Sequence, residues 1–123
     1  MPITSVRDDA RRTILTTVTG TIQVADIIAH FDNTRRGQTV DYTELIDARG
    51  AAMPYLTAAD IRHAADIVRH TPVRQKFGRR AVIVDGYVTY ELTHLFATLL
   101  ADHFSIGVFR TQRQAEDWLA GKE

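Results

Sequence analysis

The spacing of apolar residues changes several times along the chain, and each change predicts a new element. Two stretches rich in β-branched residues, 3–7 and 11–19, flank the polar turn RDDAR, which predicts two antiparallel strands. Beyond Gly20 the apolar residues take the spacing of one helical face, which predicts a first helix. The residues of this stripe are Val24, Ile27, Ile28 and Phe31.

Strands and helices then alternate to the end of the chain. DYTELIDA, residues 41–48, has the pattern of a strand, and a second helix is expected from Thr57 to Pro72, whose ring cannot continue the helical hydrogen bonds. RRAVIVDG, residues 79–86, is an unbroken apolar run typical of a strand covered on both faces, and we expect it in the middle of the sheet. TYELTHLFATLLADHF predicts a third helix, SIGVFRT a last strand and QRQAEDWLAG a short helix. The stripe of the second helix is Ile61, Ala64, Ala65 and Val68.

This alternation favours right-handed crossovers between parallel strands. The sequence therefore predicts an α/β fold, a four- to five-stranded mostly parallel sheet of successive β-α units with an antiparallel N-terminal strand. No linker, repeat or low-complexity segment divides residues 1–123, and a hydrophobic content of 45% is enough for one core. We expect a single domain.

Charge and composition narrow the function classes. Fifteen basic residues balance fifteen acidic ones, so no overall field attracts phosphate backbones, and we expect no nucleic-acid partner. The lack of cysteine removes thiolate chemistry and fits a reducing compartment. The N-terminus lacks a signal-peptide pattern, and no apolar run approaches the roughly 20 residues that cross a bilayer. We expect a cytoplasmic protein without membrane insertion.

The segment HAADIVRH places His63, Asp66 and His70 at spacings that could hold a metal ion. On a helix these three residues lie opposite the apolar stripe, where solvated side chains are usual. Arg62 and Arg69 flank the same face, where they would pair with Asp66 and repel a cation. We therefore expect a surface salt-bridge network and no metal site.

Histidines and acids elsewhere offer weak evidence for catalysis. His30 and His94 meet no obvious acid, and His103 is expected on the apolar stripe at a helix end, in a partly buried structural role. Asp47 and Asp85 are expected at the C-terminal ends of neighbouring strands, where open α/β sheets bind ligands, so they would carry the chemistry if the protein were an enzyme. The sequence shows no second catalytic residue that would act together with either carboxylate. We expect no catalytic residue.

Motifs for nucleophilic catalysis and nucleotide binding are also missing. The two serines, Ser5 and Ser105, do not lie in a strand-to-helix elbow, and the glycines after the strands stand singly rather than in a phosphate-binding loop. The sequence therefore predicts no cofactor.

Several segments together resemble the SpoIIAA-like, or STAS, family, and within it the small bacterial proteins labelled SpoIIAA-like. They are ELIDARG before LTAADIRHAADIV, RRAVIVDG before YELTHLFATLL, and IGVFRTQRQAEDWL, and they span most of residues 13–120. The resemblance implies a mostly parallel sheet with packed helices in a non-enzymatic module.

In the anti-sigma-factor antagonists of this family, the loop after the strand that corresponds to ELIDA carries a serine whose phosphorylation breaks a partner interface. The loop RGAAMPYLTAAD has no serine here. Thr57 precedes Asp60 by three residues, as in a capping box, so we expect Thr57 to cap the helix. A phosphoryl group on Thr57 would be favoured by the helix N-terminus, but no motif in the loop supports such a switch.

The apolar loop favours a regulatory or protein-interaction module, which would contact a partner through residues 50–56 and the helix starting near Thr57. Methionine and tyrosine are enriched at interfaces. Ile67, on the outward face of that helix, could extend the patch and support a homodimer. The interaction residues that we predict are Met53, Pro54, Tyr55, Leu56, Thr57 and Ile67.

A small-molecule carrier is the alternative, with a lipid, a nucleotide or another small apolar or anionic ligand between helices and sheet. Tyr87 and Tyr90 would line that pocket, and Asp47, Arg49 and Asp85 lie at the same edge of the sheet. We expect the arginines at strand ends to be solvated, although they could meet an anionic group. They are Arg49, Arg79, Arg80 and Arg110.

Overall fold

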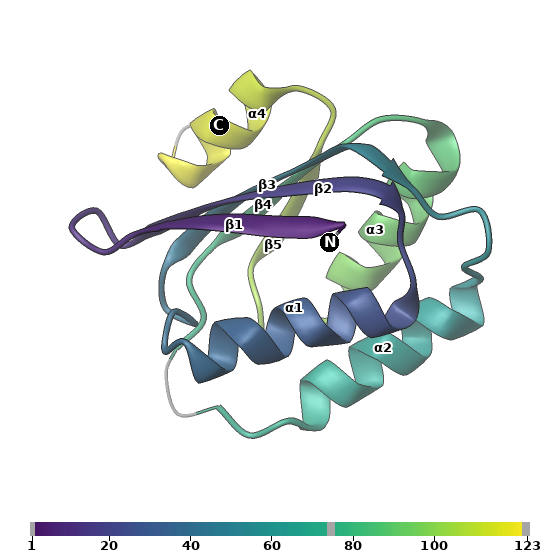
Figure 1. The fold of residues 1–123 in the computed structure, drawn as a ribbon, viewed down its shortest axis with the longest axis horizontal. Coiled ribbons are helices and arrows are strands. Elements are labelled where there is room, and N and C mark those ends of the chain that lie inside the picture. The colour runs from purple at the N-terminus through teal and green to yellow at the C-terminus, as the bar shows by residue number, and fades with distance from the viewer. Residues whose placement is uncertain (1, 74–75, 122–123) are drawn as a thin grey trace.

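The computed structural model describes residues 2–73 and 76–121, and its strands and helices follow the predicted order (Figure 1). The elements are β1 (Ile3–Asp8), β2 (Thr13–Thr21), α1 (Val24–Arg36), β3 (Thr43–Ala52), α2 (Ala58–His70), β4 (Arg80–Val84), α3 (Tyr87–Leu99), β5 (Ile106–Phe109) and α4 (Gln112–Leu119).

The strands form one five-stranded sheet in the order β1-β2-β3-β4-β5. β1 pairs antiparallel with β2, and the other neighbours pair in parallel, so the predicted α/β fold class is confirmed. The expectation that residues 79–86 form the middle strand is wrong, because β3 lies there. β4 is nevertheless buried along its whole length, since helices cover both of its faces, and full burial does not require the central position.

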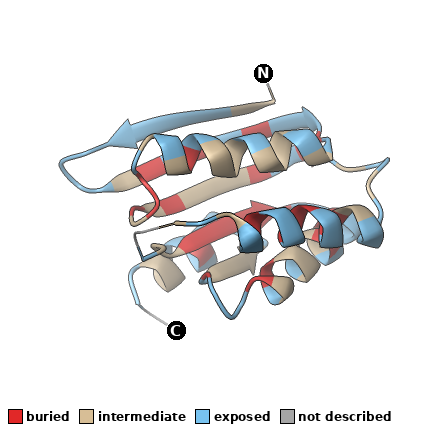
Figure 2. Ribbon diagram, turned by 90° about the horizontal axis from the view of Figure 1, so that it is seen from below, coloured by how far each residue is buried: buried red, intermediate tan, exposed pale blue. Residues whose placement is uncertain are grey.

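Helices cover the two faces of the sheet unequally. α1, α2 and α3 lie on one face, and α4 lies on the other, against β4, β5 and part of β3 (Figure 1). β1 and β2 have no helix on the α4 side, so β1 is exposed along most of its length (Figure 2). Val6 and Leu15, opposite each other in the β1-β2 register, remain exposed on this uncovered half.

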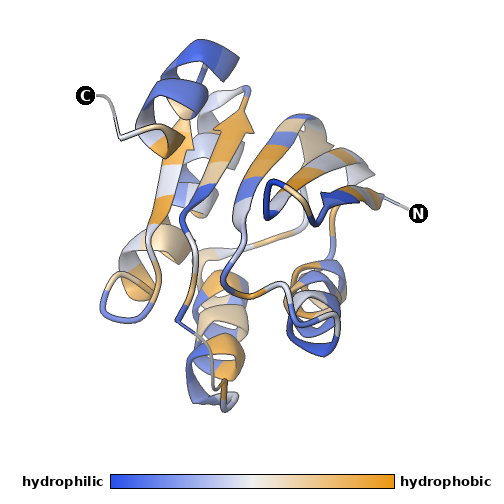
Figure 3. Cartoon of the chain, turned by 90° about the vertical axis from the view of Figure 1, so that its left-hand side faces the viewer, coloured by the Kyte–Doolittle hydropathy of each residue, from blue (hydrophilic) through white to orange (hydrophobic). Residues whose placement is uncertain are grey.

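Apolar residues gather in the strands and on the helical faces turned toward them (Figure 3). The larger core lies between the sheet and α1 to α3, where Ile61 and Leu100 are fully buried. A smaller core joins Ala81 and Ile83 of β4 to Ala115 of α4. None of the helices in residues 2–73 and 76–121 combines the length and the apolar character needed to span a lipid bilayer.

Candidate functional site

The predicted loop 50–56 begins later than expected, because β3 continues to Ala52. Residues 50–52 pair with residues 19–21 of β2, after a shift in register between Thr17 and Thr19. The predicted start of the loop is therefore wrong, since strand pairing continues past Gly50. Residues 53–57 connect β3 to α2.

The side chains of this connection divide between the core and the solvent. Met53 is half-buried and packs against the larger core, and Leu56 is half-buried as well. Pro54 is exposed and Tyr55 is 75% exposed. Only Pro54 and Tyr55 of these four residues lie mainly in solvent, so the apolar surface is narrower than the sequence suggested.

Thr57 forms the capping box that the sequence predicts. The Thr57 hydroxyl accepts a hydrogen bond from the backbone N–H of Asp60 at 3.2 Å, and the Asp60 carboxylate accepts one from the backbone N–H of Thr57 at 2.9 Å. Ile67 lies on the outward face of the same helix and is 36% exposed. The start of α2 after Thr57 and the outward position of Ile67 therefore agree with the helix that the apolar stripe predicts.

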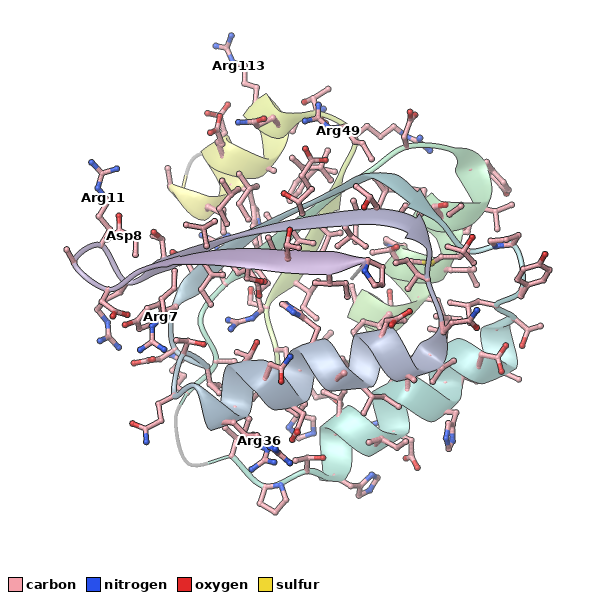
Figure 4. The ribbon with its side chains drawn as sticks, viewed as in Figure 1. Arg7, Asp8, Arg11, Arg36, Arg49 and Arg113 are labelled. Atoms are coloured by element: carbon pink, nitrogen blue, oxygen red, sulfur yellow. The ribbon has the colours of Figure 1, made fainter. Side chains whose placement is uncertain are left out.

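The prediction that Asp47 lies at the C-terminal end of its strand is wrong, because β3 continues to Ala52, whereas Asp85 directly follows β4. Each carboxylate binds a local partner. Arg49 donates to both oxygens of Asp47, at 3.0 and 2.8 Å, and this hydrogen bonding lowers the pKa of Asp47. Asp85 accepts a hydrogen bond from the backbone N–H of Gly86 at 3.1 Å. Arg49 lies on the side of the sheet that carries α4 (Figure 4). Asp47 and Arg49 form a partly exposed ion pair on the central strand β3.

The three residues considered for a metal do not form a site. His70 Nδ1 lies 3.2 Å from a carboxylate oxygen of Asp66, and no group of three histidine or acidic side chains suited to a metal occurs in the described residues. The predicted pairing of Arg69 with Asp66 is wrong, because Arg69 reaches across to Asp102, beyond the end of α3. His63 is exposed.

Of the two remaining surface histidines, His94 and His103, only His103 differs from the prediction. His94 is exposed and stacks on Tyr90 with 5.9 Å between ring centroids. His103 is exposed and lies beyond the helix, since α3 ends at Leu99. The prediction that His103 lies partly buried on the helical stripe is therefore wrong.

A buried group of charged and polar residues, which the sequence analysis missed, lies between α1 and the sheet. Glu44 of β3 is 1% exposed and Arg80 of β4 is 8% exposed. Arg80 Nε lies 3.2 Å from Glu44 Oε1, and His30 Nε2 of α1 lies 2.8 Å from Glu44 Oε2. Thr16 of β2 donates a further hydrogen bond to Glu44. We call these four residues the Glu44 cluster.

Two predictions are corrected by this cluster. His30 was expected to meet no acid, and Arg80 was expected to be solvated, but both contact Glu44. Paired residues of parallel strands face the same side, so the register of Glu44 with Arg80 directs both side chains inward. The signal was present in β3, where Glu44 shares the alternating phase of Ile46 and Ala48.

Arg80 also organises the connections at this end of the sheet. Its guanidinium donates to backbone carbonyls of the segments that precede β3 and β4, at 2.8 to 3.2 Å. Burial lowers the pKa of Arg80. Burial alone would raise the pKa of Glu44, but the hydrogen bond from His30 and the positive charge of Arg80 hold this pKa below its ordinary value. The carbonyls are those of Thr39, Val40, Tyr42 and Gly78.

Two cavities lie between the helices and the sheet. An inner apolar cavity of about 160 Å³ is lined by the larger core and by the helix side of the sheet. An outer pocket of about 300 Å³ lies between α1 and the edge strand β1. The two share Ile3, His30 and Thr34, so His30 stands between them.

The tyrosines predicted to line a ligand pocket do not line the inner cavity. Tyr87 is 73% exposed, and Tyr90 lies beneath the guanidinium of Arg110, 4.5 Å from its ring centroid. α3 instead contributes Leu92, Thr93 and Phe96. The prediction therefore named the correct helix, α3, but chose residues on a face that does not line the inner cavity.

Comparison with solved structures shows that the fold has been observed in other proteins. No family model and no curated protein matches the sequence. The structure is similar to an anti-sigma factor antagonist from Mycobacterium paratuberculosis, with 17% identity, 96% of this chain and 94% of that chain covered, and a TM-score of 0.57. It is also similar to an uncharacterized protein of the DUF3478 family from Shewanella loihica, with 19% identity, 95% and 91% covered, and a TM-score of 0.53. That protein is described as having a SpoIIAA-like fold, and this chain has the same fold.

Proposed function

We propose that the protein is a non-catalytic regulatory module of STAS type, which binds a protein partner through residues 53–57 and the start of α2. The observation that carries this proposal is Tyr55, which is 75% exposed on a short connection anchored by the inward Met53. Exposed tyrosines on rigidly held segments are favourable contact residues. The similar anti-sigma factor antagonist supports a protein as the partner.

In this proposal the module works without a serine phospho-switch. The loop contains no serine, and the Thr57 hydroxyl is already bound in the helix cap, 3.0 Å from a carboxylate oxygen of Asp60. A phosphoryl group on Thr57 would meet that carboxylate as a like charge. The engagement of Asp47 by Arg49 likewise supports a module that does not use this acid in catalysis.

Site-specific photo-crosslinking tests the interface. A photoreactive benzoyl-phenylalanine in place of Tyr55 is expected to give an adduct with one protein in the native host, and Tyr55→Ala is expected to abolish binding of that protein. The control carries the same group in place of Leu15, which is 51% exposed on the uncovered half of the sheet. Equal adducts from both positions, or none from position 55, would contradict the proposal.

A small-molecule carrier is the second candidate, favoured by the inner cavity. Its lining is mainly apolar, although His30, Glu44 and Arg80 also border it. The Thr93 hydroxyl, buried in this wall, has no hydrogen-bond partner among the described residues. Such a cavity suits an apolar molecule with one polar group that pairs with Thr93. Native mass spectrometry of gently purified protein tests this function: a stoichiometric adduct that is lost on denaturing extraction supports it, and the bare mass opposes it.

A further inference from the structure

The outer pocket, which we call the α1–β1 pocket, has polar walls on both sides. α1 contributes Asp26, His30 and Asn33, which recur at helical spacing, and β1 contributes Ser5 and Arg7. Figure 4 shows Arg7 beneath β1, near the C-terminal end of α1. A volume of about 300 Å³ is enough for a small metabolite. None of the residues proposed above for partner binding lines this pocket.

The Glu44 cluster fixes the direction of the hydrogen bonds behind the pocket. An ionised carboxylate only accepts, so Thr16 gives its hydroxyl hydrogen to Glu44. The Thr16 oxygen must then accept the hydrogen of Ser5, whose oxygen lies 2.9 Å away. For the same reason His30 carries a hydrogen on Nε2, which donates to Glu44 at 2.8 Å.

These hydrogen-bond directions leave hydrogen-bond acceptors, rather than donors, available to a ligand in the α1–β1 pocket. Ser5 already donates its only hydroxyl hydrogen to Thr16, so the Ser5 oxygen can only accept hydrogen bonds from a ligand. In the neutral imidazole of His30, a hydrogen on Nε2 leaves a lone pair on Nδ1. Nδ1 has no hydrogen-bond partner among the described residues. Both residues therefore favour a ligand that supplies N–H or O–H groups.

The charges along the pocket favour a cation. The Asp26 carboxylate accepts the backbone N–H of Gln23 at 2.8 Å and forms no ion pair within residues 2–73 and 76–121. Arg7 does not neutralise it, because its guanidinium binds Asp9 and donates to the carbonyl of Gly37 at 3.1 Å. Asp26 and His30 are four residues apart on one helix, about 5–6 Å between their Cβ atoms.

We propose that the α1–β1 pocket binds a small amine that also carries a hydroxyl group, with its ammonium at Asp26 and its hydroxyl donating its one hydrogen to Nδ1 of His30. Ethanolamine, with two carbons between nitrogen and oxygen, is the simplest compound that carries both groups. The Glu44 cluster holds His30 in the tautomer that accepts the hydroxyl hydrogen. Asn33 and the apolar wall formed by Ile3 and Ile14 complete the pocket.

An NMR titration of the whole protein with ethanolamine at pH 8, at constant ionic strength, tests this site. Saturable shifts are expected at the backbone amides of Ser5, Asp26 and His30. Ethylene glycol lacks the charge, and acetate has the opposite charge, so both are expected to bind at least tenfold more weakly. No saturable shift with ethanolamine, or equal shifts with ethylene glycol, would overturn the proposal.

Paired variants separate the site from a general charge effect. Asp26→Asn keeps an acceptor for the Gln23 N–H and removes the charge, and it is expected to weaken ethanolamine binding at least tenfold. Asp60→Asn is the control, because Asp60 occupies the same third position of α2 and caps it in the same way. Unchanged binding by Asp26→Asn, or an equal loss in Asp60→Asn, would refute the assignment.

The tautomer of His30 gives a readout that does not depend on the ligand. Long-range proton–nitrogen correlation spectra at pH 8 are expected to show the hydrogen on Nε2 of His30. A hydrogen on Nδ1 would turn the proposed acceptor into a donor and overturn the proposal.

Discussion

At the scale of single residues, Glu44 is held by partners from three other elements. Its carboxylate is almost fully buried and binds groups from α1, β2 and β4. A buried ion pair adds little net stability compared with apolar residues, but removal of one partner leaves an uncompensated charge in the core. We therefore expect the folding stability to depend strongly on both carboxylate oxygens of Glu44.

Glu44→Gln is expected to lower the free energy of unfolding by about 3 kcal/mol, because Arg80 then stays buried without its counter-charge. Urea denaturation followed by circular dichroism measures the change. Asp47→Asn is the control: it breaks the partly exposed pair with Arg49 and should cost less than about 1 kcal/mol. Equal losses in the two variants would contradict the assigned role of Glu44.

The lowered pKa of Glu44 predicts the pH dependence of stability. A carboxyl whose pKa is lower in the folded state stabilises the fold above its unfolded value, here 4.5, and loses this contribution as the pH falls through the folded value. The stability difference between wild type and Glu44→Gln should therefore shrink as the pH decreases below 4.5. Unfolding curves of both proteins at several acidic pH values test this, and a constant difference would argue against an ionised Glu44.

At the scale of elements, the helices that follow β3 and β5 begin in the same way. Thr57 and Thr111 are both N-caps, and each hydroxyl accepts a backbone N–H three residues later at 3.2 Å. These bonds satisfy a donor that the first turn of a helix leaves unpaired. The start of α2 is thus fixed by local chemistry, which positions Tyr55 just before it.

Thr57→Ala is expected to lower the free energy of unfolding by about 1 kcal/mol through loss of the cap, whereas Thr57→Ser should retain most of it. Thermal and urea unfolding of the two variants measure the effect. A similar loss in both would show that the threonine methyl group, rather than the hydroxyl, supports this position.

At the scale of the whole molecule, large apolar side chains of the described residues remain exposed in three places. The first is the Val6 and Leu15 pair on the half of the sheet without α4, the second includes Tyr55 and Ile67 around α2, and the third is Tyr87 and Val88 at the start of α3. The interaction module proposed above would use the second surface, and a second copy of the chain is one occupant that it could accept.

If the α2 surface forms a homodimer, wild-type protein at high micromolar concentration should sediment as a dimer, and Ile67→Lys should weaken the dimer by at least about tenfold. Leu15→Lys places the same charge on the first exposed surface and should leave the dimer intact. A wild type that sediments as a monomer, or a dimer lost only in Leu15→Lys, would exclude this arrangement.

Much of the fold could be predicted because it depends on short-range patterns. The stripe beginning at Val24 predicts α1, the unbroken run in β4 predicts a strand covered on both faces, and Thr57 with Asp60 predicts where α2 begins. Each signal lies within one or two turns of helix or one strand. The resemblance to SpoIIAA-like proteins predicted the same architecture, which the similar structures support.

The tertiary structure decided which distant residues meet. Strand register places Glu44 beside Arg80, and the packing of α1 brings His30 onto the same carboxylate from another element. Pairing with β2 extends β3 to Ala52 and shortens the predicted loop. Sequence periodicity determines the face on which a residue lies, but only the register and the packing of elements determine which residues share that face in space, so the sequence specified the helices, strands and caps, and the folded chain alone created the Glu44 cluster and the pocket beside it.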